Sequence, residues 1–305
     1  MSADHLALVG PTASGKSALA LDLARRLGDV EIVSVDSMQV YRGMDIGTAK
    51  PTAAEQAEIP HHLIDLVDPD DDYTVSRFQS DCRAALADIE RRGRRALLVG
   101  GTGLYLRAIT DQLEIPGQFT EVREQLEGDP DTAALFARLQ SLDPVAAGRM
   151  EPSNRRRVVR ALEVTLGSGR PFSSFGPGLE QYPPAPFPVF GLAIDLHLLR
   201  DRIAQRYQQQ LRDGFLAEVA ALRARPAGIS RTARQALGYA ELLDHLEGGT
   251  PIEEAVATAI TRTNQFARRQ LRWFRRDPRI RWIPSEGADG ENALAVMLRS
   301  LEDSV

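Results

Sequence analysis

The clearest chemical pattern lies near the N-terminus, where eight residues fit the phosphate-loop pattern G-x-x-x-x-G-K-[ST] at every specified position. They are Gly10, Pro11, Thr12, Ala13, Ser14, Gly15, Lys16 and Ser17. Turned backbone N–H groups and a helix N-terminus can hold an anion there, and the lysine adds a full positive charge. The hydroxyl of Ser17 can coordinate a Mg²⁺ that bridges phosphate oxygens. A chance match is the alternative, but an apolar run precedes the segment and a helical stretch follows it. We therefore expect a di- or triphosphate site.

Two polar residues follow expected strands further along the chain. Asp36 follows the β-branched run at 31–35, and Thr102 follows the buried run at 95–99 after two glycines. In an open α/β sheet, the carboxyl ends of the strands face the ligand crevice. The strand at 95–99 lacks the acidic residue with which nucleotide triphosphatases hold Mg²⁺. We expect Asp36 and Thr102 to lie at the crevice together with the phosphate loop.

Arginines gather in two places. Residues 262–282 contain eight arginines against one acid, Asp277, with Trp273, Phe274 and Trp282 among them. Arginines mixed with aromatic residues are typical of surfaces that bind a phosphate backbone and stack on bases. A second cluster comprises residues 155–157 and Arg160. The alternative for both clusters is a solvated basic face paired with acids elsewhere.

Arg202 and Arg206 are four residues apart on an expected helix and can share one face of it. Two guanidinium groups in this arrangement suit a diphosphate, because each can bind phosphate oxygens in a forked geometry. Ordinary ion pairs with Asp201, Asp213 or Glu218 are an equally good interpretation. The sequence leaves both interpretations open.

Composition limits the class of protein. The 305 residues are 43% hydrophobic, carry a formal net charge of −5 and contain no apolar run long enough to span a membrane. We expect a cytoplasmic protein with no membrane segment and no secretory signal. The single cysteine, Cys82, cannot form an internal disulfide and is expected to be buried as a small apolar residue.

The order of apolar runs and helical stretches predicts an α/β fold. We expect a P-loop kinase-like parallel sheet with helices on both faces, a mainly helical insertion domain and a helical C-terminal segment. The core is expected at 1–111 and 189–305, and the insertion at 112–188. Other expected elements are a strand at 63–67 that follows His61 and His62, a last core strand at 189–194, helices at 198–224 and 235–246, and a helix that a capping box at 250–253 opens.

Three classes of function compete on these features. A small-molecule kinase explains the phosphate loop but neither the missing acid nor the arginine-rich segment. A regulatory phosphate-binding module does not need Asp36 and Thr102 at the crevice. A transferase that joins a diphosphate-bearing donor to a nucleic acid accounts for most of the features, because its leaving group needs a phosphate site and a Mg²⁺.

Several longer motifs resemble those of bacterial tRNA dimethylallyltransferases over nearly the whole chain. They are the phosphate loop, Asp-Ser-Met-Gln-Val-Tyr at 36–41, Gly-Met-Asp-Ile-Gly-Thr-Ala-Lys-Pro at 43–51, Gly-Gly-Thr-Gly-Leu-Tyr at 100–105, Arg-Ala-Leu-Glu-Val at 160–164, Gln-Ala-Leu-Gly-Tyr at 235–239 and Arg-Arg-Gln-Leu-Arg-Trp-Phe at 268–274. The phosphate loop is generic, whereas the two runs within 36–51 are far more diagnostic. One departure is Ala240, where some relatives carry a basic residue.

The resemblance implies transfer of a dimethylallyl group from dimethylallyl diphosphate to N6 of the adenosine that follows the anticodon in tRNA, with Mg²⁺. It implies that Asp36 is the general base, that Thr102 helps to hold the reacting groups, and that Arg206, Lys16 and Ser17 with its metal stabilise the diphosphate, to which we add Arg202. It implies tRNA contacts at Asp36, Ser37, Met38, Gln39, Thr102, Arg123, Arg156, Arg157, Arg160, Gln235, Gly238, Tyr239, Arg268, Arg269, Arg272 and Arg275. We expect a monomer.

Overall fold

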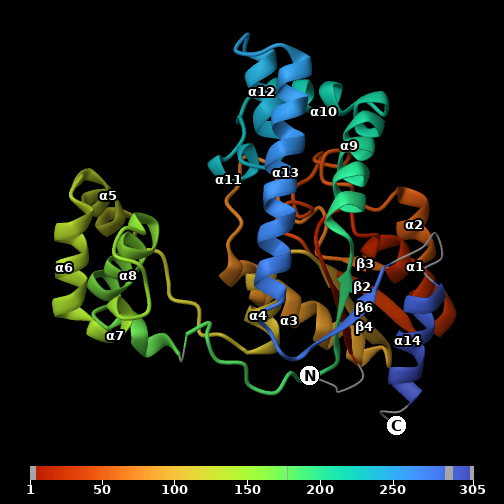
Figure 1. Cartoon of the computed structure of the whole chain (residues 1–305), viewed down its shortest axis with the longest axis horizontal. Coiled ribbons are helices and arrows are strands. Elements are labelled where there is room, and N and C mark those ends of the chain that lie inside the picture. Colours follow the sequence, from red (N-terminus) through yellow and green to blue (C-terminus); the bar gives the residue numbers. More distant parts are fainter. Residues whose placement is uncertain (1–4, 177, 286–290, 303–305) are drawn as a thin grey trace. The chain divides into compact units, whose positions relative to one another are not determined.

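The computed structural model divides into two compact units, and a six-stranded parallel sheet forms the centre of the larger one (Figure 1). The structure describes residues 5–176, 178–285 and 291–302. The larger unit comprises Met1–Thr110 and Pro184–Val305, and the smaller unit comprises Asp111–Pro183. The expected insertion, 112–188, starts within one residue of the smaller unit and extends five residues beyond it.

The six strands lie in the order β3-β2-β4-β1-β5-β6, and all neighbours are parallel. They are β1 (Leu6–Val9), β2 (Val30–Val35), β3 (His61–His62), β4 (Arg95–Gly100), β5 (Val189–Ala193) and β6 (Ile280–Pro284). Successive side chains of a strand point to opposite faces. In β1, Leu6 and Leu8 therefore join one apolar cluster, whereas Ala7 and Val9 join the other. Both faces of the sheet are buried.

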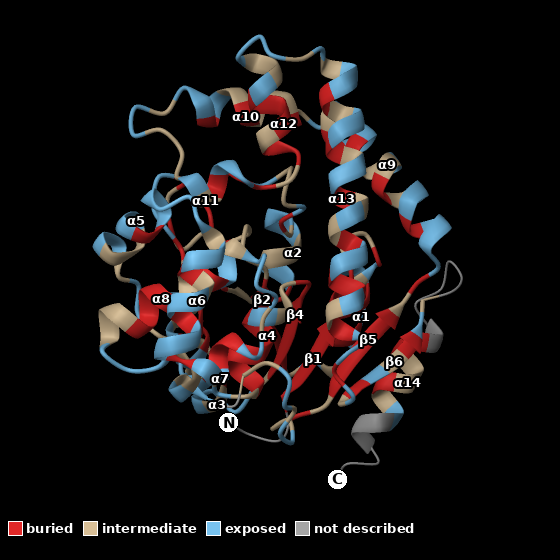
Figure 2. Ribbon diagram, turned by 60° about the vertical axis from the view of Figure 1, so that its left-hand side comes forward, coloured by how far each residue is buried: buried red, intermediate tan, exposed pale blue. Residues whose placement is uncertain are grey.

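Helices cover both faces of this sheet, as the sequence predicts. Helices α1 and α14 belong to the apolar cluster on one face, and α3, α4, α9, α10, α12 and α13 belong to the cluster on the other. The helices of the larger unit are α1 (Lys16–Leu27), α2 (Ala53–Glu58), α3 (Val75–Arg91), α4 (Gly103–Thr110), α9 (Leu196–Arg212), α10 (Phe215–Arg223), α11 (Arg231–Arg234), α12 (Tyr239–Leu246), α13 (Ile252–Phe274) and α14 (Glu291–Glu302). Figure 2 shows buried strands and an α13 with a buried and an exposed side. Within the described residues, we find no helix with the length and apolar character that crossing a membrane requires.

The smaller unit is helical and has its own apolar core, which includes Leu139, Val158 and Leu162. Its elements are α5 (Thr120–Gly128), α6 (Thr132–Leu142), α7 (Pro144–Ala147), α8 (Arg155–Ser168) and the short 3₁₀ helix η1 (Phe172–Phe175). Asn154 caps α8, because its side chain accepts a hydrogen bond from the N–H of Arg157. The arginines at 155–157 therefore form the first turn of a helix.

Two expected strands differ from the structure. The strand at 63–67 is absent from the described sheet, and β3 consists of His61 and His62 themselves. Leu63 and Asp65 adopt positive φ angles of 63° and 53°, which end the extended conformation. The segment at 189–194 is β5 but not the last strand, because β6 pairs with it at the edge of the sheet. The basic composition of 279–282 concealed this edge strand.

Three expectations about the C-terminal helices also need correction. The helix at 198–224 is broken into α9 and α10 at Gly214, whose φ is 101°. The helix at 235–246 begins only after Gly238, and α11 precedes it. No capping box opens α13, whose N-cap is Pro251; the side chain of Thr250 is hydrogen-bonded to Asp244 instead. The glycines allow turns that hydrophobic periodicity does not reveal.

Glu218 of α10 holds the turn at residues 45–47 against the C-terminal helices. Its Oε2 accepts hydrogen bonds from the N–H groups of Asp45 (2.9 Å) and Ile46 (2.8 Å), and its Oε1 accepts one from Gly47 (3.1 Å). The hydroxyl of Tyr239 donates a fourth, at 2.6 Å. Burial raises the pKa of Tyr239 far above its usual range, so the phenol remains a donor.

We predict that Glu218→Gln lowers the free energy of unfolding by about 1–3 kcal/mol, because an amide –NH₂ cannot accept the hydrogen bonds that one carboxylate oxygen now accepts. Urea denaturation of the variant and the wild type measures this difference.

The matched control is Glu124→Gln on α5, where the side chain is exposed and makes no hydrogen bond within the described part of the chain. Equal stability losses for the two variants would contradict the role assigned to Glu218.

Candidate active site

The phosphate loop links the end of β1 to the start of α1, as its sequence pattern predicts. Gly15 is the N-cap of α1 with a φ of 93°, a conformation that favours glycine, and no side chain caps the helix. The first-turn N–H groups of α1 therefore remain available to an anion. The loop geometry fits a phosphate group at this position.

Two arginines of α9 reach this loop. Arg206 donates a hydrogen bond from Nη1 to the hydroxyl of Thr12 (2.7 Å), and Arg202 donates a longer one to the carbonyl of Ser14 (3.5 Å). Neither forms an ion pair within the described residues with the acids that the alternative interpretation named. The contacts favour the diphosphate interpretation of this pair.

Several polar groups at the loop lack a protein partner that would neutralise or satisfy them. The Nε of Arg206 and the Oγ of Ser14 are buried without a hydrogen-bond partner among the described residues. Lys16 donates from Nζ to the carbonyl of Pro11 (2.6 Å), a neutral acceptor. Burial lowers the pKa of Lys16 to about 8, with the charge of Asp36 opposing this shift and Arg206 adding to it. An anionic ligand would satisfy all three groups.

Asp36 and Thr102 follow the ends of neighbouring strands, as expected. Val35 of β2 is in register with Gly100 of β4, and the N–H of Thr102 donates to the carbonyl of Val35 (3.3 Å). A Cβ on Gly100 would lie 2.0 Å from that carbonyl oxygen, so this close approach requires glycine. Asp36 accepts the N–H of Met38 through Oδ1 (2.8 Å). Its Oδ2 makes no hydrogen bond within the described chain and can accept a proton.

A cavity of about 430 Å³ connects these groups. Its walls include the phosphate loop from Thr12 to Ser17 together with Asp36, Gln39, Arg206 and Gln270. Thr102 does not line this cavity, although it lies next to the end of β2. The structure therefore brings together the predicted phosphate-binding residues and Asp36, and places Thr102 just outside the cavity wall.

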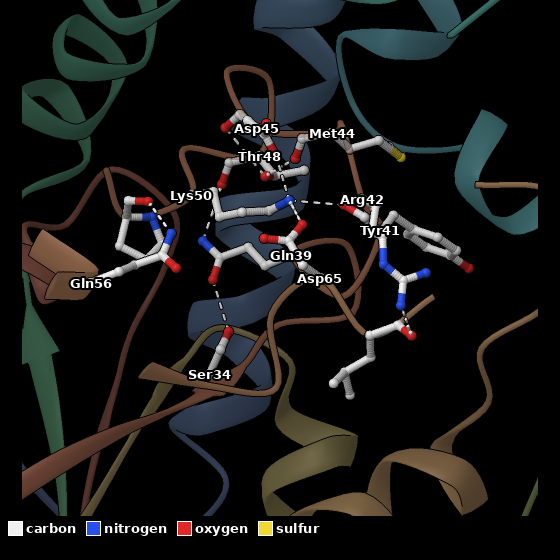
Figure 3. A network of polar contacts seen from close by, with 12 residues as sticks. Ser34, Gln39, Tyr41, Arg42, Met44, Asp45, Thr48, Lys50, Gln56 and Asp65 are labelled. Carbon is white, nitrogen blue, oxygen red and sulfur yellow. Dashed lines mark hydrogen bonds and ion pairs between the residues drawn. The ribbon is translucent and has the colours of Figure 1, made fainter. Parts of the chain in front are cut away.

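The segment at 36–50 is fixed by two side chains that sequence reasoning did not assign to this task (Figure 3). Gln39 accepts a hydrogen bond from Ser34 (2.8 Å) and donates to the carbonyls of Thr48 and Ala49 (3.3 and 3.2 Å). The ammonium of Lys50, only 2% exposed, contacts the carbonyl of Tyr41 and the carboxylates of Asp45 and Asp65. We expected Gln39 to contact the tRNA, but its side-chain amide makes hydrogen bonds within the loop itself.

The exposed side of α13 carries the predicted basic row. Arg268, Arg269, Arg272 and Arg275 are all exposed, and the described chain offers none of them an ion pair. Two other arginines of the cluster are paired, Arg262 with Glu241 and Arg279 with Asp277. The alternative interpretation, in which the arginines pair with acids elsewhere, therefore holds for Arg262 and Arg279 and not for the row on α13.

The arginines of the smaller unit divide in the same way. Arg160 donates to Glu163 (2.7 Å) and to the carbonyls of Pro116 and Gly117, and Arg123 pairs with Glu127 (2.9 Å). Arg156 and Arg157 are exposed and make no side-chain contact that competes with a ligand within the described residues. Of the predicted tRNA contacts in this unit, these two are the more accessible.

The predicted contacts at 235–239 lie in different environments. Gln235 is exposed, whereas Gly238 and Tyr239 are buried, with Tyr239 packed edge-on against Phe215 at 4.9 Å between ring centroids. The structure thus does not present Tyr239 at the surface. Ser37 and Met38 lie in a loop directly after Asp36, as expected, and both are half-buried.

Gln270 of α13 is a site residue that sequence reasoning missed. Its side chain lines the cavity and bridges the phosphate loop and the end of β4, with Thr12 and Gly101 as partners. Its signal in the sequence is a polar residue on the buried side of an amphipathic helix, between Ala267 and Leu271. Lys50 gives a similar signal, a lysine within a segment otherwise too glycine-rich for a core element.

The chain matches the protein family described as IPP transferase over residues 39–277, and the family described as isopentenyl transferase over residues 4–65. It is similar to a tRNA dimethylallyltransferase of Pseudarthrobacter chlorophenolicus, with 49% identity over 287 residues, 93% of this chain and 94% of the relative. A tRNA dimethylallyltransferase of Bifidobacterium longum is 45% identical over 300 residues, 96% of this chain and 90% of the relative.

Solved structures of similar proteins share the fold. The full-length tRNA isopentenylpyrophosphate transferase of Bacillus halodurans aligns with a TM-score of 0.72 at 36% identity, covering 99% of this chain and 98% of its own. A eukaryotic dimethylallyltransferase described as acting on tRNA aligns with a TM-score of 0.81 at 26% identity, covering 98% of this chain and 79% of its own. The α/β fold class predicted from the sequence is confirmed.

The lowered pKa of Lys16 would make the binding of a diphosphate at this loop pH-dependent. A bound anion stabilises the ammonium form and raises the pKa of Lys16, so above about pH 8 binding must take up a proton. We predict that affinity for methyl diphosphate falls above pH 8, approaching about tenfold per pH unit, because the ligand itself is fully ionised there. Isothermal titration calorimetry measures the affinity and, in two buffers, the proton uptake.

Lys16→Arg is the control, because its guanidinium stays charged throughout this range. Its affinity, whatever its value at pH 7, should not change with pH. An affinity of the wild type that is constant up to about pH 9.5 would contradict the lowered pKa of Lys16, whereas an unchanged affinity of Lys16→Met at pH 7 would contradict its role in binding the anion.

Proposed function

The chain belongs to the IPP transferase family, and from this premise we propose that it transfers a dimethylallyl group from dimethylallyl diphosphate to N6 of the adenosine next to the anticodon, on its 3′ side, in tRNA. It is a prenyl transferase that acts on tRNA. The observation that carries the detailed proposal is a cavity in which the phosphate loop, the cationic side chains of Lys16 and Arg206, and Asp36 meet. This set suits a reaction whose leaving group is a diphosphate and whose nucleophile must lose a proton.

The chemical roles follow from the positions of the groups. The N6 nitrogen forms a bond to C1 of the dimethylallyl group while the bond from C1 to the diphosphate oxygen breaks. Asp36, whose Oδ2 is free to accept, takes the proton that N6 loses. Lys16, Arg206 and Arg202 interact with the negative charge that accumulates on the leaving diphosphate, where preorganised cations are most effective. Thr102 would hold the reacting groups from the neighbouring strand end.

We propose Mg²⁺ as the metal. The residues present fit it: Ser17 is exposed in the first turn of α1 and offers a hard oxygen ligand, and the diphosphate and water would supply the others. When bound, the ion offsets charge on the diphosphate. The described residues include no cluster of three or more histidine, cysteine or carboxylate side chains that could form a separate metal site.

The nucleic acid would bind to the exposed basic row of α13 and to the accessible arginines of α8. The target base has to leave its stack to reach the cavity, which costs roughly a few kcal/mol that protein contacts must offset. A cytoplasmic location and a monomeric state remain predictions.

We predict that the protein moves label from dimethylallyl diphosphate onto an adenosine of bulk tRNA in the presence of Mg²⁺, and that Asp36→Asn slows this transfer by about 10²- to 10⁴-fold, because it removes the general base. Single-turnover transfer of label measures both, with nucleoside analysis to identify the product.

Asp201→Asn is the matched control, since this exposed side chain makes no contact within the described chain that the substitution would break. A parallel incubation with γ-labelled ATP and small-molecule acceptors tests the kinase alternative. Transfer from ATP alone would overturn the proposed function, and a nearly normal rate for Asp36→Asn would overturn the role of Asp36.

The basic row of α13 predicts strongly salt-dependent binding of tRNA. Replacing Arg268, Arg272 and Arg275 together by glutamine should reduce the slope of log affinity against log salt concentration by about two to three, since each phosphate contact contributes about 0.7–0.9. Filter binding of tRNA from about 50 to about 200 mM salt measures the slope.

A triple variant of Arg26, Arg83 and Arg212, which are exposed on other helices, controls for the change in net charge. If both triple variants change the slope equally, the α13 row is not the tRNA-binding surface.

A further inference from the structure

Gln270 links three elements that are far apart in the sequence. Its Oε1 accepts a hydrogen bond from the N–H of Thr12 (2.9 Å), in the phosphate loop after β1. Its Nε2 donates a hydrogen bond to the carbonyl of Gly101 (2.9 Å), just after β4. The residue itself is on α13 and is only 7% exposed. One buried amide therefore pairs two backbone groups that border the cavity.

The contact continues from Thr12 to the diphosphate-binding arginine. The hydroxyl of Thr12 accepts a hydrogen bond from Nη1 of Arg206 at 2.7 Å. The position of the Thr12 backbone, which Gln270 fixes, thus determines where this hydroxyl meets the guanidinium. Without the amide, the N–H of Thr12 and the carbonyl of Gly101 would both lose their protein partner.

The packing at Gly101 shows how closely the amide approaches the end of β4. A Cβ on Gly101 would lie 2.2 Å from Nε2 of Gln270 and 3.3 Å from the carbonyl oxygen of Gly10. Gln270, Gly101 and the start of the phosphate loop thus occupy one tightly packed contact. Such packing restricts the loop to one position.

Helix α13 also carries the basic row on its other side. Arg268 and Arg272 each lie two residues from Gln270, about 200° around a helix with 3.6 residues per turn. Both are exposed whereas Gln270 is buried. The same helix therefore supports the phosphate loop from one side and presents arginines from the other.

We propose that Gln270 is a positioning residue for the transfer reaction. By holding Thr12 and Gly101 together, it keeps the Thr12 hydroxyl and Arg206 aligned with the diphosphate as its charge develops. The inference rests on the proposed function, in which a diphosphate leaves from this loop. It assigns to Gln270 an effect on the donor and on catalysis, and none on the affinity for tRNA.

The test compares Gln270→Met, which has a similar shape but no hydrogen bonds, with Gln265→Met, an exposed glutamine of the same helix. We expect Gln270→Met to reduce kcat/KM for the donor by about ten- to a hundredfold, as the loss of one or two buried hydrogen bonds implies. Its KM for tRNA should stay within about threefold of the wild-type value, and Gln265→Met should leave all constants unchanged. A donor kcat/KM within about twofold of wild type, or a KM for tRNA raised more than about threefold, would overturn the proposal.

A second variant keeps the test decisive if Gln270→Met does not fold. In Gln270→Glu, the ionised carboxylate can accept from Thr12 but cannot donate to Gly101, whereas the protonated carboxyl can do both. We expect the ratio of its kcat/KM to that of the wild type to rise as the pH falls from about 8 to about 6, since burial raises the pKa of a carboxyl. A ratio independent of pH would contradict the bridging role.

Binding of inorganic pyrophosphate separates failure of this proposal from failure of the proposed function. Calorimetry with pyrophosphate needs no transfer of a prenyl group. If the wild type transfers no label to tRNA, the proposed function fails, and weaker pyrophosphate binding by Gln270→Met still supports the bridge. If the wild type transfers label and Gln270→Met matches it in transfer and in pyrophosphate binding, only the role of Gln270 fails.

Discussion

Two positive charges, on Lys16 and Arg206, line a cavity whose walls also include the carboxylates of Asp36 and Glu55, and within the described residues neither charge forms an ion pair. Removing a charge from water is unfavourable unless it is paired, and burial accordingly lowers the pKa of both side chains. Neutral acceptors, the Pro11 carbonyl and the Thr12 hydroxyl, contact them instead of acids. The free protein thus holds its cations in an electrostatically unfavourable arrangement that a diphosphate would relieve. The surrounding structure must hold these groups in place without neutralising them.

The neighbouring segment shows the opposite arrangement. Lys50 is as thoroughly buried as any group at the site, yet two carboxylates and a carbonyl surround its ammonium. Glu218 is likewise saturated, with three backbone N–H groups and a phenol. Within the described residues, the charges of Lys50 and Glu218, which hold the loop, are paired, whereas Lys16 and Arg206 at the phosphate loop contact only neutral acceptors. Lys50 is buried and Lys16 is half-buried, and this difference in exposure together with the difference in pairing separates structural from functional charges here.

Features that depend on neighbouring residues could be predicted from the sequence. The phosphate loop, the strand ends at Asp36 and Thr102, the cap at Asn154 and the two-sided sheet each follow from local patterns. The two hydrogen bonds of Gln270 could not be predicted from the sequence, because its partners are 258 and 169 residues away. A polar side chain on a helix is also usually exposed to solvent, so its type gives no sign of a buried contact. The predictions of an unbroken helix at 198–224 and of 189–194 as the last strand were wrong for a related reason. A glycine within a helical pattern and a basic edge strand are decided by packing, which the sequence does not display.

The arginine-rich segment shows why net charge is a poor guide to the ligands of this chain. The whole chain carries −5, yet residues 262–282 alone carry +7. Pairing divides this segment further: Arg262 pairs with Glu241 and Arg279 with Asp277, whereas the row at 268–275 forms no ion pair with the described part of the chain. A polyanion that binds here interacts with the electrostatic potential of these nearby arginines, because solvent and salt screen charges that lie more than about 8–10 Å away. Because α13 carries this row on one side and the bridge to the phosphate loop on the other, its position sets both this local potential and the geometry of the cavity.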